Sequence, residues 1–409
     1  MMEELFKKAL GIDEPWYVKS IDFIVESKRL DIELDFKRGS TFTDESDGED
    51  AKAYKAYDTV RKKLRHLNFF EHECYLYVRV PRIKKDDGRV RLIMPPWSGV
   101  LSGFTLLFES LIIQLCKSMP VHKVSELVSI SDYKVWKMLE LYIVGAQYGE
   151  DLSAIEVVGM DETSVSRGHD YVTLFVDMVN RRTIHVSDGK DSETVRDFVG
   201  MQADANGCAE QIKQLSCDMS PAFIKGVEEQ LPEAEITFDK FHIVKIFNKA
   251  VDEVRKEEVK LNPLLKGARY VLLKNESNLT KKQKKIKENL SLSKLNLKSL
   301  RTMSIRESYQ QIDQAKSSEK FIILLKKWYF WATHSRLEPI IKAAKTIKRH
   351  WDGMINWKQS QINNGLLEGL NSVLQAAKRK ARGYKKPHFK IIAFLLTGKL
   401  NFSKVNKFC

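Results

Sequence analysis

The sequence has little cysteine and no long apolar run. Its five cysteines form no CxxC pair and are scattered at Cys74, Cys116, Cys208, Cys217 and Cys409. Neither a disulfide framework nor a thiolate zinc site is therefore indicated, and we expect a reduced, cytoplasmic setting. The run nearest to the roughly 20 apolar residues that cross a bilayer is Leu106 to Cys116, which Glu109 interrupts. The N-terminus mixes acidic and basic residues, unlike a signal peptide, so we expect no membrane association.

Acidic side chains are outnumbered by basic ones. The formal net charge is +14, which indicates a polyanionic partner, most often nucleic acid. A basic protein that is merely soluble is the alternative. At 409 residues, the chain is long enough for about two to four domains.

The clearest strand pattern runs from Ile155 to Thr163 (IEVVGMDET). This apolar run rises to Asp161 and then turns polar, and Gly159 permits close approach of a neighbour. Tyr171 to Val179 and Arg182 to Val186 predict two further strands, which makes a three-stranded meander.

Helices and strands alternate after the meander. The expected elements are a helix from Ser192 with that serine as N-cap, a strand Ile212 to Cys217, a helix Ala222 to Gln230 and a strand Glu235 to Phe238. Asp161 and Asp218 each come just past a strand's C-terminal end, where open α/β sheets place ligands. Two neighbouring carboxylates repel one another unless a cation lies between them, and Mg²⁺ prefers such oxygen ligands.

The first 100 residues predict a small β-rich module. Its expected strands are Ser20 to Val25, Leu30 to Leu34 and Glu73 to Val80, the last ending at Pro81. Gly39 to Lys52 is polar and rich in Ser, Asp and Gly, which predicts a loop.

Helical patterns follow the β-rich module. Thr105 to Ser118 predicts one helix, and Val121 to Leu139 predicts two short helices that cross at Ser125. The spacing suits a helix-turn-helix whose second helix, Asp132 to Leu141, enters the major groove. Ser129 stands where a turn glycine is usual, and an ordinary helical hairpin is the alternative.

Basic helices dominate the C-terminal part. Residues 240–360 are mostly helical in pattern, and we expect the aromatics of Phe321 to Trp331 to be core residues. Ile362 to Arg382 predicts a long helix that carries Glu368 between two glycines, Gly365 and Gly369, which permit close approach of backbone or ligand. Basic residues of the helix-turn-helix and of this helix's end should contact DNA phosphates. They are Lys123, Lys134, Lys137, Lys378, Arg379, Lys380, Arg382, Lys385 and Lys386.

The chain resembles DDE transposases of bacterial insertion sequences, and more narrowly the ISL-three family. The segments that match are GMDET at 159–163, CDMSPAF at 217–223, FDKFHIVK at 238–245 and NNGLLEGLNSVLQAAKRKARGY at 363–384. Weaker matches are RHLNFF at 65–70, VRVPRI at 78–83 and PPWSG at 95–99. The ordered set is specific, although no single segment is.

The resemblance implies catalytic residues. It makes Asp161, Asp218 and Glu368 the catalytic and metal-binding triad, and it gives Asp239 a supporting role. Three carboxylates can hold two Mg²⁺ about 3.5–4 Å apart, and Mn²⁺ can substitute. This chemistry needs no side-chain nucleophile, which agrees with the absence of a convincing Ser, His or Cys constellation in the sequence.

The resemblance also implies an architecture, with one departure. It predicts an α/β ribonuclease-H-like catalytic domain with a large helical insertion, preceded by a helix-turn-helix and a small β-rich module. The expected boundaries are 1–100, 101–150, 151–245 with 361–409 for the catalytic core, and 246–360 for the insertion. Family members bind zinc through cysteines in the N-terminal segment, but here Phe42 to Lys52 and Pro81 to Gly88 contain none. We therefore expect no zinc.

The function implied is a Mg²⁺-dependent transposase that cuts double-stranded DNA at inverted-repeat ends and joins them to target DNA. A homodimer is expected when two ends are synapsed, in a bacterial cytoplasm at the nucleoid. A catalytically silent DNA-binding regulator derived from a transposase is the alternative, and a ribonuclease-H-like nuclease is a third reading.

Overall fold

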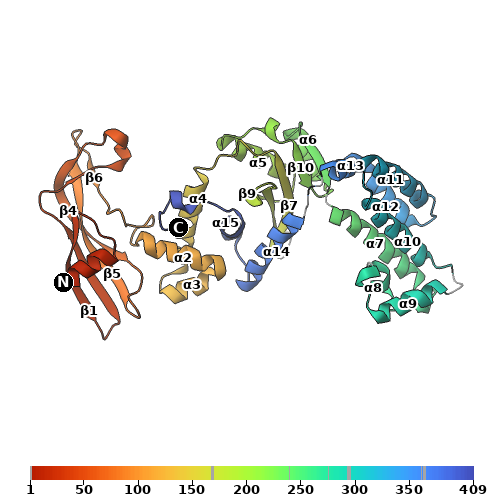
Figure 1. Ribbon diagram of the computed structural model, residues 1–409, viewed down its shortest axis with the longest axis horizontal. Helices are drawn as coiled ribbons and strands as arrows, with labels where there is room; N and C mark the ends of the chain where they lie inside the picture. Colours follow the sequence, from red (N-terminus) through yellow and green to blue (C-terminus); the bar gives the residue numbers. More distant parts are fainter. Residues whose placement is uncertain are drawn as a thin grey trace. The chain divides into compact units, whose positions relative to one another are not determined.

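The chain forms two compact units in a computed structural model (Figure 1). Unit 1 contains Met1–Glu150 and Leu374–Cys409, and unit 2 contains Asp151–Val373. The structure describes residues 2–166, 170–238, 240–274, 276–292, 296–360, 362 and 365–409. Within these ranges, no helix is long and apolar enough to span a membrane.

Unit 1 begins with helix α1 (Met2–Ala9) and a six-stranded sheet. The sheet has the order β1-β2-β5-β4-β3, with β6 paired to the end of β5. Its strands are β1 (Trp16–Ile24), β2 (Arg29–Phe36), β3 (Thr41–Phe42), β4 (Tyr54–Arg65), β5 (Glu73–Lys84) and β6 (Val90–Leu92). Alternate apolar residues of β2 and β5 are buried in one core with Trp16 and Trp97, so one face of the sheet carries the hydrophobic stabilisation.

Two features of this sheet differ from the sequence prediction. Strand β4 was not predicted, because charged residues such as Asp58 and Lys62 also occupy its half-buried alternate positions and conceal the period of two. Strand β5 does not end at Pro81 but continues to Lys84. The strand continues because the residues on either side, Val80 and Arg82, both pair with β4, and the Pro81 carbonyl accepts a hydrogen bond from the Ile93 N–H at 3.0 Å.

The rest of unit 1 is helical. It contains α2 (Leu106–Ser118), α3 (Val121–Val128), α4 (Asp132–Gln147), the end of α14 (Gly365–Lys380) and α15 (Lys386–Thr397). The predicted break between α3 and α4 is confirmed. Ser129 adopts a left-handed conformation with φ of 56°, the conformation that a glycine usually adopts at such a turn. At the predicted crossing, the Ser125 hydroxyl donates to the Asp132 carboxylate.

A buried carboxylate connects the loop before α2 to the helices. Glu109 of α2 accepts hydrogen bonds from the Val100 and Leu101 N–H groups, each at 2.8 Å, and from the Tyr142 hydroxyl at 2.7 Å. Burial raises the pKa of this carboxyl group. Glu109, which interrupts the apolar run, therefore connects this loop to α2 and α4 through hydrogen bonds.

Unit 2 contains a five-stranded sheet in the order β11-β10-β7-β8-β9. The strands are β7 (Val157–Ser166), β8 (Asp170–Asp177), β9 (Arg182–Asp188), β10 (Gln214–Cys217) and β11 (Glu235–Phe238). The first three form the predicted antiparallel meander, and β10 and β11 run parallel to β7. Helices α5 (Glu193–Asp204) and α6 (Pro221–Gln230) pack their apolar side chains on one face. Ser192 precedes α5 as predicted but makes no side-chain cap bond.

Seven helices follow in unit 2. They are α7 (Lys240–Glu258), α8 (Arg269–Leu273), α9 (Lys281–Leu292), α10 (Lys298–Asp313), α11 (Ser318–Thr333), α12 (Glu338–Arg349) and α13 (Trp351–Ser360). Phe321 and Trp328 of α11 are core residues as expected. Phe330 and Trp331 are instead 65% and 46% exposed, because the buried side of α11 follows Phe321, Leu325 and Trp328 at helical spacing.

Candidate functional site

Asp161 lies on β7, and Asp218 directly follows β10, the strand that runs parallel to β7 in unit 2. Strands β7 and β10 pair with Ser216 opposite Gly159, and continuing this register by two residues sets Asp218 opposite Asp161. Asp218 directly follows β10, as predicted. Its carboxylate accepts a hydrogen bond from the Ser220 N–H at 2.9 Å, just before α6 begins.

The prediction that Asp161 ends its strand is wrong. Strand β7 continues to Ser166 because the antiparallel strand β8 pairs with it as far as Ser166 opposite Asp170. Its parallel neighbour β10 stops at Cys217. Asp161 therefore lies at the point where the parallel part of the sheet ends, which still is the carboxyl edge where such sheets place ligands.

Asp161 belongs to the sheet face opposite α5 and α6. Val158 and Met160 of β7 pack into the core with those helices, and successive side chains of a strand point to opposite faces. Helix α14 lies on the second face. A Cβ atom on Gly159 would meet the Leu367 side chain at 3.0 Å, so the predicted close approach at this glycine is confirmed.

Asn371 of α14 makes the direct contact with Asp161. Its Nδ2 donates a hydrogen bond to Asp161 Oδ2 at 2.6 Å, and the Glu162 N–H donates to Asp161 Oδ1 at 2.9 Å. The Asn371 Oδ1 atom is buried and has no hydrogen-bond partner among the described residues. Sequence reasoning missed Asn371. The available signal was its position three residues after Glu368, on the same side of a helix.

Glu368 lies on the same helix, one turn before Asn371, and its side chain is exposed. A spacing of three residues puts Glu368 and Asn371 about 60° apart around the helix axis. The fourth predicted acidic residue, Asp239, lies outside the described residues.

The donor atoms at this edge suit a hard cation. Asp161 and Asp218 supply carboxylate oxygens, and Asn371 supplies a buried amide oxygen without a partner, all of which Mg²⁺ accepts as ligands. In the described part of the chain, no group of three His, Cys, Asp or Glu side chains is close enough to hold a metal ion. Asp161, Asp218 and Glu368 therefore do not form a preformed three-carboxylate cluster.

The predicted phosphate-contacting residues of the helix-turn-helix region lie in unit 1. Lys123 of α3 is paired with Glu126 at 2.8 Å, and Lys137 of α4 with Glu140 at 2.9 Å. Lys134 lies over the Phe104 ring, 5.6 Å from its centroid. These cations are on or near the protein surface, where DNA phosphates can compete with their acidic partners.

The basic residues after Glu368 belong to the same unit. Lys378, Arg379 and Lys380 form the last turn of α14, and Arg382, Lys385 and Lys386 lead into α15. The Lys380 ammonium donates to the Ser118 carbonyl at 2.6 Å, across 262 residues of sequence. The two predicted basic groups, which are remote in sequence, therefore belong to one compact unit.

The two segments without cysteine in the N-terminal module are held together by ion pairs. Lys85 has a side chain only 7% exposed, and its ammonium lies 2.6 Å from Asp44 and 2.7 Å from Asp47. The hydrogen bond from Lys85 is the main reason why the pKa of Asp44 is lowered to about 2. An ammonium repels a metal cation, so this position does not fit zinc.

Comparisons with known proteins agree on one family. A family model described as a transposase, of the DDE ISL3 group, matches residues 158–393. This range includes Asp161, Asp218, Glu368 and Asn371. The transposase for insertion sequence element IS1001 of Bordetella parapertussis is 26% identical over 82% of this chain and 84% of its own length. The transposase for IS1557 of Mycobacterium tuberculosis (strain CDC 1551 / Oshkosh) is 25% identical over 82% of this chain and 81% of its own.

Proposed function

The chain belongs to the ISL3 family of DDE transposases, and we propose that it cuts DNA at inverted-repeat element ends and joins those ends to target DNA. Asp161, Asp218 and Glu368 are the proposed metal-binding carboxylates. The main support is the parallel pairing of β7 and β10, whose register, continued by two residues, would set Asp218 opposite Asp161. Helix α14, which carries Glu368, packs on the same face of the sheet.

The chain's own residues orient and enclose this site. Asn371 donates to one oxygen of Asp161 and the Glu162 N–H donates to the other, which fixes the plane of the carboxylate. Leu367 packs against Gly159 on the same face of the sheet. Asp161, Asp218 and Glu368 would hold Mg²⁺, which when bound would supply activation of the attacking hydroxyl and stabilisation of the leaving oxygen.

A ribonuclease-H-like catalytic core is the architecture we propose for unit 2. An antiparallel meander with two parallel strands added beside β7 supports it, as do helices α5 and α6 on one face. Helices α7 to α13 would form the helical insertion before Glu368. Asp239 would support the site as an additional acidic residue.

DNA binding is the role we propose for unit 1. The left-handed turn at Ser129 and the buried Ser125 at the crossing support a helix-turn-helix with α4 as the recognition helix. The exposed side of α4 carries Tyr133, Lys134 and Lys137. The basic end of α14 belongs to this unit and would add phosphate contacts. A homodimer would hold two element ends together during joining.

Charge-removing substitutions test the proposed active site. Asp161→Asn, Asp218→Asn and Glu368→Gln keep the size of the side chain, but Mg²⁺ exchanges water for neutral ligands reluctantly. Each variant should lose strand cleavage and joining of a labelled end duplex. Gel shifts on the same preparations should show unchanged or slightly tighter binding, because phosphate contacts lie elsewhere.

The outcomes separate the alternatives. Combined variants should be no worse than single ones, because the residues act together, and Asp239→Asn should have a milder effect. Full activity of Glu368→Gln would show that another residue is the third carboxylate. Wild-type protein that binds ends but never cuts them, with Mg²⁺ or Mn²⁺, would establish the silent regulator instead.

A further inference from the structure

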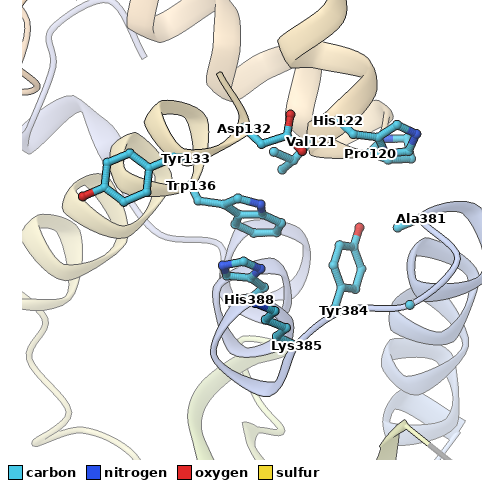
Figure 2. A pocket seen from close by; sticks show the side chains of 11 residues that line it. Pro120, Val121, His122, Asp132, Tyr133, Trp136, Ala381, Tyr384, Lys385 and His388 are labelled. Carbon is cyan, nitrogen blue, oxygen red and sulfur yellow. The ribbon is translucent and has the colours of Figure 1, made fainter. Parts of the chain in front are cut away.

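A cavity of about 570 Å³ lies in unit 1 beside the proposed recognition helix (Figure 2). It is bounded by the start of α3, the first turns of α4 and the segment that joins α14 to α15. Its volume is in the range that holds a small organic group. Neither the proposed active site nor the phosphate contacts account for it.

Aromatic rings form two of its walls. Trp136 of α4 stacks on His388 of α15 with ring centroids 3.9 Å apart and an angle of 6° between the planes. The Tyr384 ring stands at 89° to Trp136, with centroids 5.9 Å apart, and Figure 2 shows its hydroxyl pointing towards the α3 side. A flat ring that stacks on the face of Tyr384 therefore meets Trp136 with its edge.

The backbone at the end of α14 places Tyr384 there. Arg382 and Gly383 have φ of 63° and 115°, and the Gly383 N–H donates to the Lys378 carbonyl at 2.9 Å. Two successive left-handed residues turn the chain sharply, so that Tyr384 points into the cavity rather than along the helix. This gives a physical purpose to the KARGY segment at 380–384.

The polar groups of the cavity complement a nucleotide. Asp132 is fixed by the Ser125 hydroxyl and can accept hydrogen bonds from the exocyclic amine of a base. The Lys385 side chain is exposed at the rim, where it can meet a phosphate. Burial is the main reason why the pKa of Tyr384 is raised to about 12, so its hydroxyl stays a hydrogen-bond donor.

We propose that this cavity binds one unpaired base of the DNA, stacked on Tyr384 with its edge against Trp136 and its phosphate near Lys385. The proposal rests on the proposed DNA-binding role of unit 1. Helix α4 would then have two roles. Its exposed side would contact the duplex, and Trp136 would help to form the binding site for the base. The base would come from an element end that is opened locally or from a single strand.

Duplexes that differ by one mispaired base test this directly. Affinity would be measured for a fully paired duplex, for the same duplex with a single mismatch, for its single strand and for deoxyadenosine monophosphate alone. A mismatched base costs less to turn out than a paired one, so the mismatched duplex should bind the wild-type protein roughly tenfold more tightly. A 2-aminopurine placed at the mismatch should show the same event by fluorescence.

Three tyrosine variants test whether the base binds in this cavity. Tyr384→Ala should lose the advantage of the mismatched duplex, because base–aromatic stacking is worth roughly a five- to hundredfold change in affinity, whereas Tyr384→Phe should retain it. Tyr148→Ala is the matched control, since Tyr148 follows α4 and is 95% exposed, outside the lining of the cavity.

The outcomes are separable. If all duplexes bind in a salt-dependent way and the mismatch does not increase affinity, the proposed base-binding site is wrong but the DNA-binding proposal stands. No binding of any duplex would overturn both. If circular dichroism shows that Tyr384→Ala does not fold, the affinities of the wild-type protein for the paired and mismatched duplexes test the proposal by themselves. A response to the single strand but not to the mismatched duplex would identify a strand end as the source of the base.

Discussion

Replacing Asn371 by alanine should slow strand cleavage by roughly 10- to 100-fold while leaving DNA binding unchanged. The Asn371 Nδ2 donates to Asp161 Oδ2 at 2.6 Å, and a hydrogen bond to a charged group contributes about 1.5–3 kcal/mol. Each 1.4 kcal/mol of lost transition-state stabilisation is about a factor of ten in rate. The loss should appear in the rate of cleavage because the amide orients a carboxylate that does not contact the sequence-reading surface.

Asp and Ala substitutions at this position should differ in their dependence on metal and pH. Asn371→Asp retains the shape but places a second carboxylate against Asp161, and neighbouring carboxylates raise one another's pKa values. Its cleavage should therefore recover at high Mg²⁺ concentration and at higher pH, whereas that of Asn371→Ala should not.

Asn356 provides a matched control in the same unit. Its Nδ2 donates to the Ile236 carbonyl at 3.2 Å, so Asn356→Ala removes a structural hydrogen bond of the same kind. The assay is single-turnover cleavage of a labelled end duplex, with melting temperatures measured on the same samples. A cleavage rate for Asn371→Ala equal to wild type, or a loss matched by Asn356→Ala at equal stability, would refute the reasoning.

Further expectations concern the N-terminal module, the loop before α2 and the DNA-binding residues. Purified protein should contain less than stoichiometric zinc, and a chelator should leave its melting temperature unchanged. The Lys85→Met variant should have a lower melting temperature. Stoichiometric zinc by elemental analysis would contradict the expected loss of the metal. Because the pKa of Asp44 is lowered to about 2, its ion pair should stabilise the module above about pH 4 and be lost as pH falls towards 2, measured by acid unfolding. Glu109→Leu should destabilise the protein in chemical denaturation by about 1–3 kcal/mol for each buried donor left unpaired; an unchanged midpoint would show that water replaces the carboxylate. Affinity for DNA should fall with salt at a slope of roughly −0.9 per phosphate neutralised, and Lys134→Ala and Lys137→Ala should both weaken end binding; if neither does, α4 is not the recognition helix.

The sequence predicted the sheet of unit 2 because its strands follow simple apolar patterns with short connections. Glu235–Phe238 was predicted to the residue, and Asp218 was correctly placed after its strand. The error at Asp161 has a physical cause. A change from apolar to polar residues shows where a strand leaves the core, but hydrogen bonding to β8 continues beyond that point.

Other features depend on contacts that no local pattern contains. Asn371 is an ordinary polar residue within a helix, and only the packing of α14 over Gly159 brings it to Asp161. The stack of Trp136 on His388 likewise joins residues from opposite ends of the chain. The exposed Phe330 and Trp331 could not be separated from their buried neighbours, because only Lys326 and Lys327 interrupt this apolar and aromatic segment.

The division of unit 1 into two chain segments has a consequence for synthesis. A ribosome completes Met1–Glu150 long before Leu374–Cys409, and α15 supplies the His388 ring on which Trp136 of α4 stacks. Until the last helix emerges, the unit proposed to hold DNA lacks one wall of its cavity and its basic end. A prematurely terminated chain should thus be a poor competitor for element ends. Because translation completes unit 2 before unit 1, a chain with a complete DNA-binding unit would also contain the complete catalytic unit.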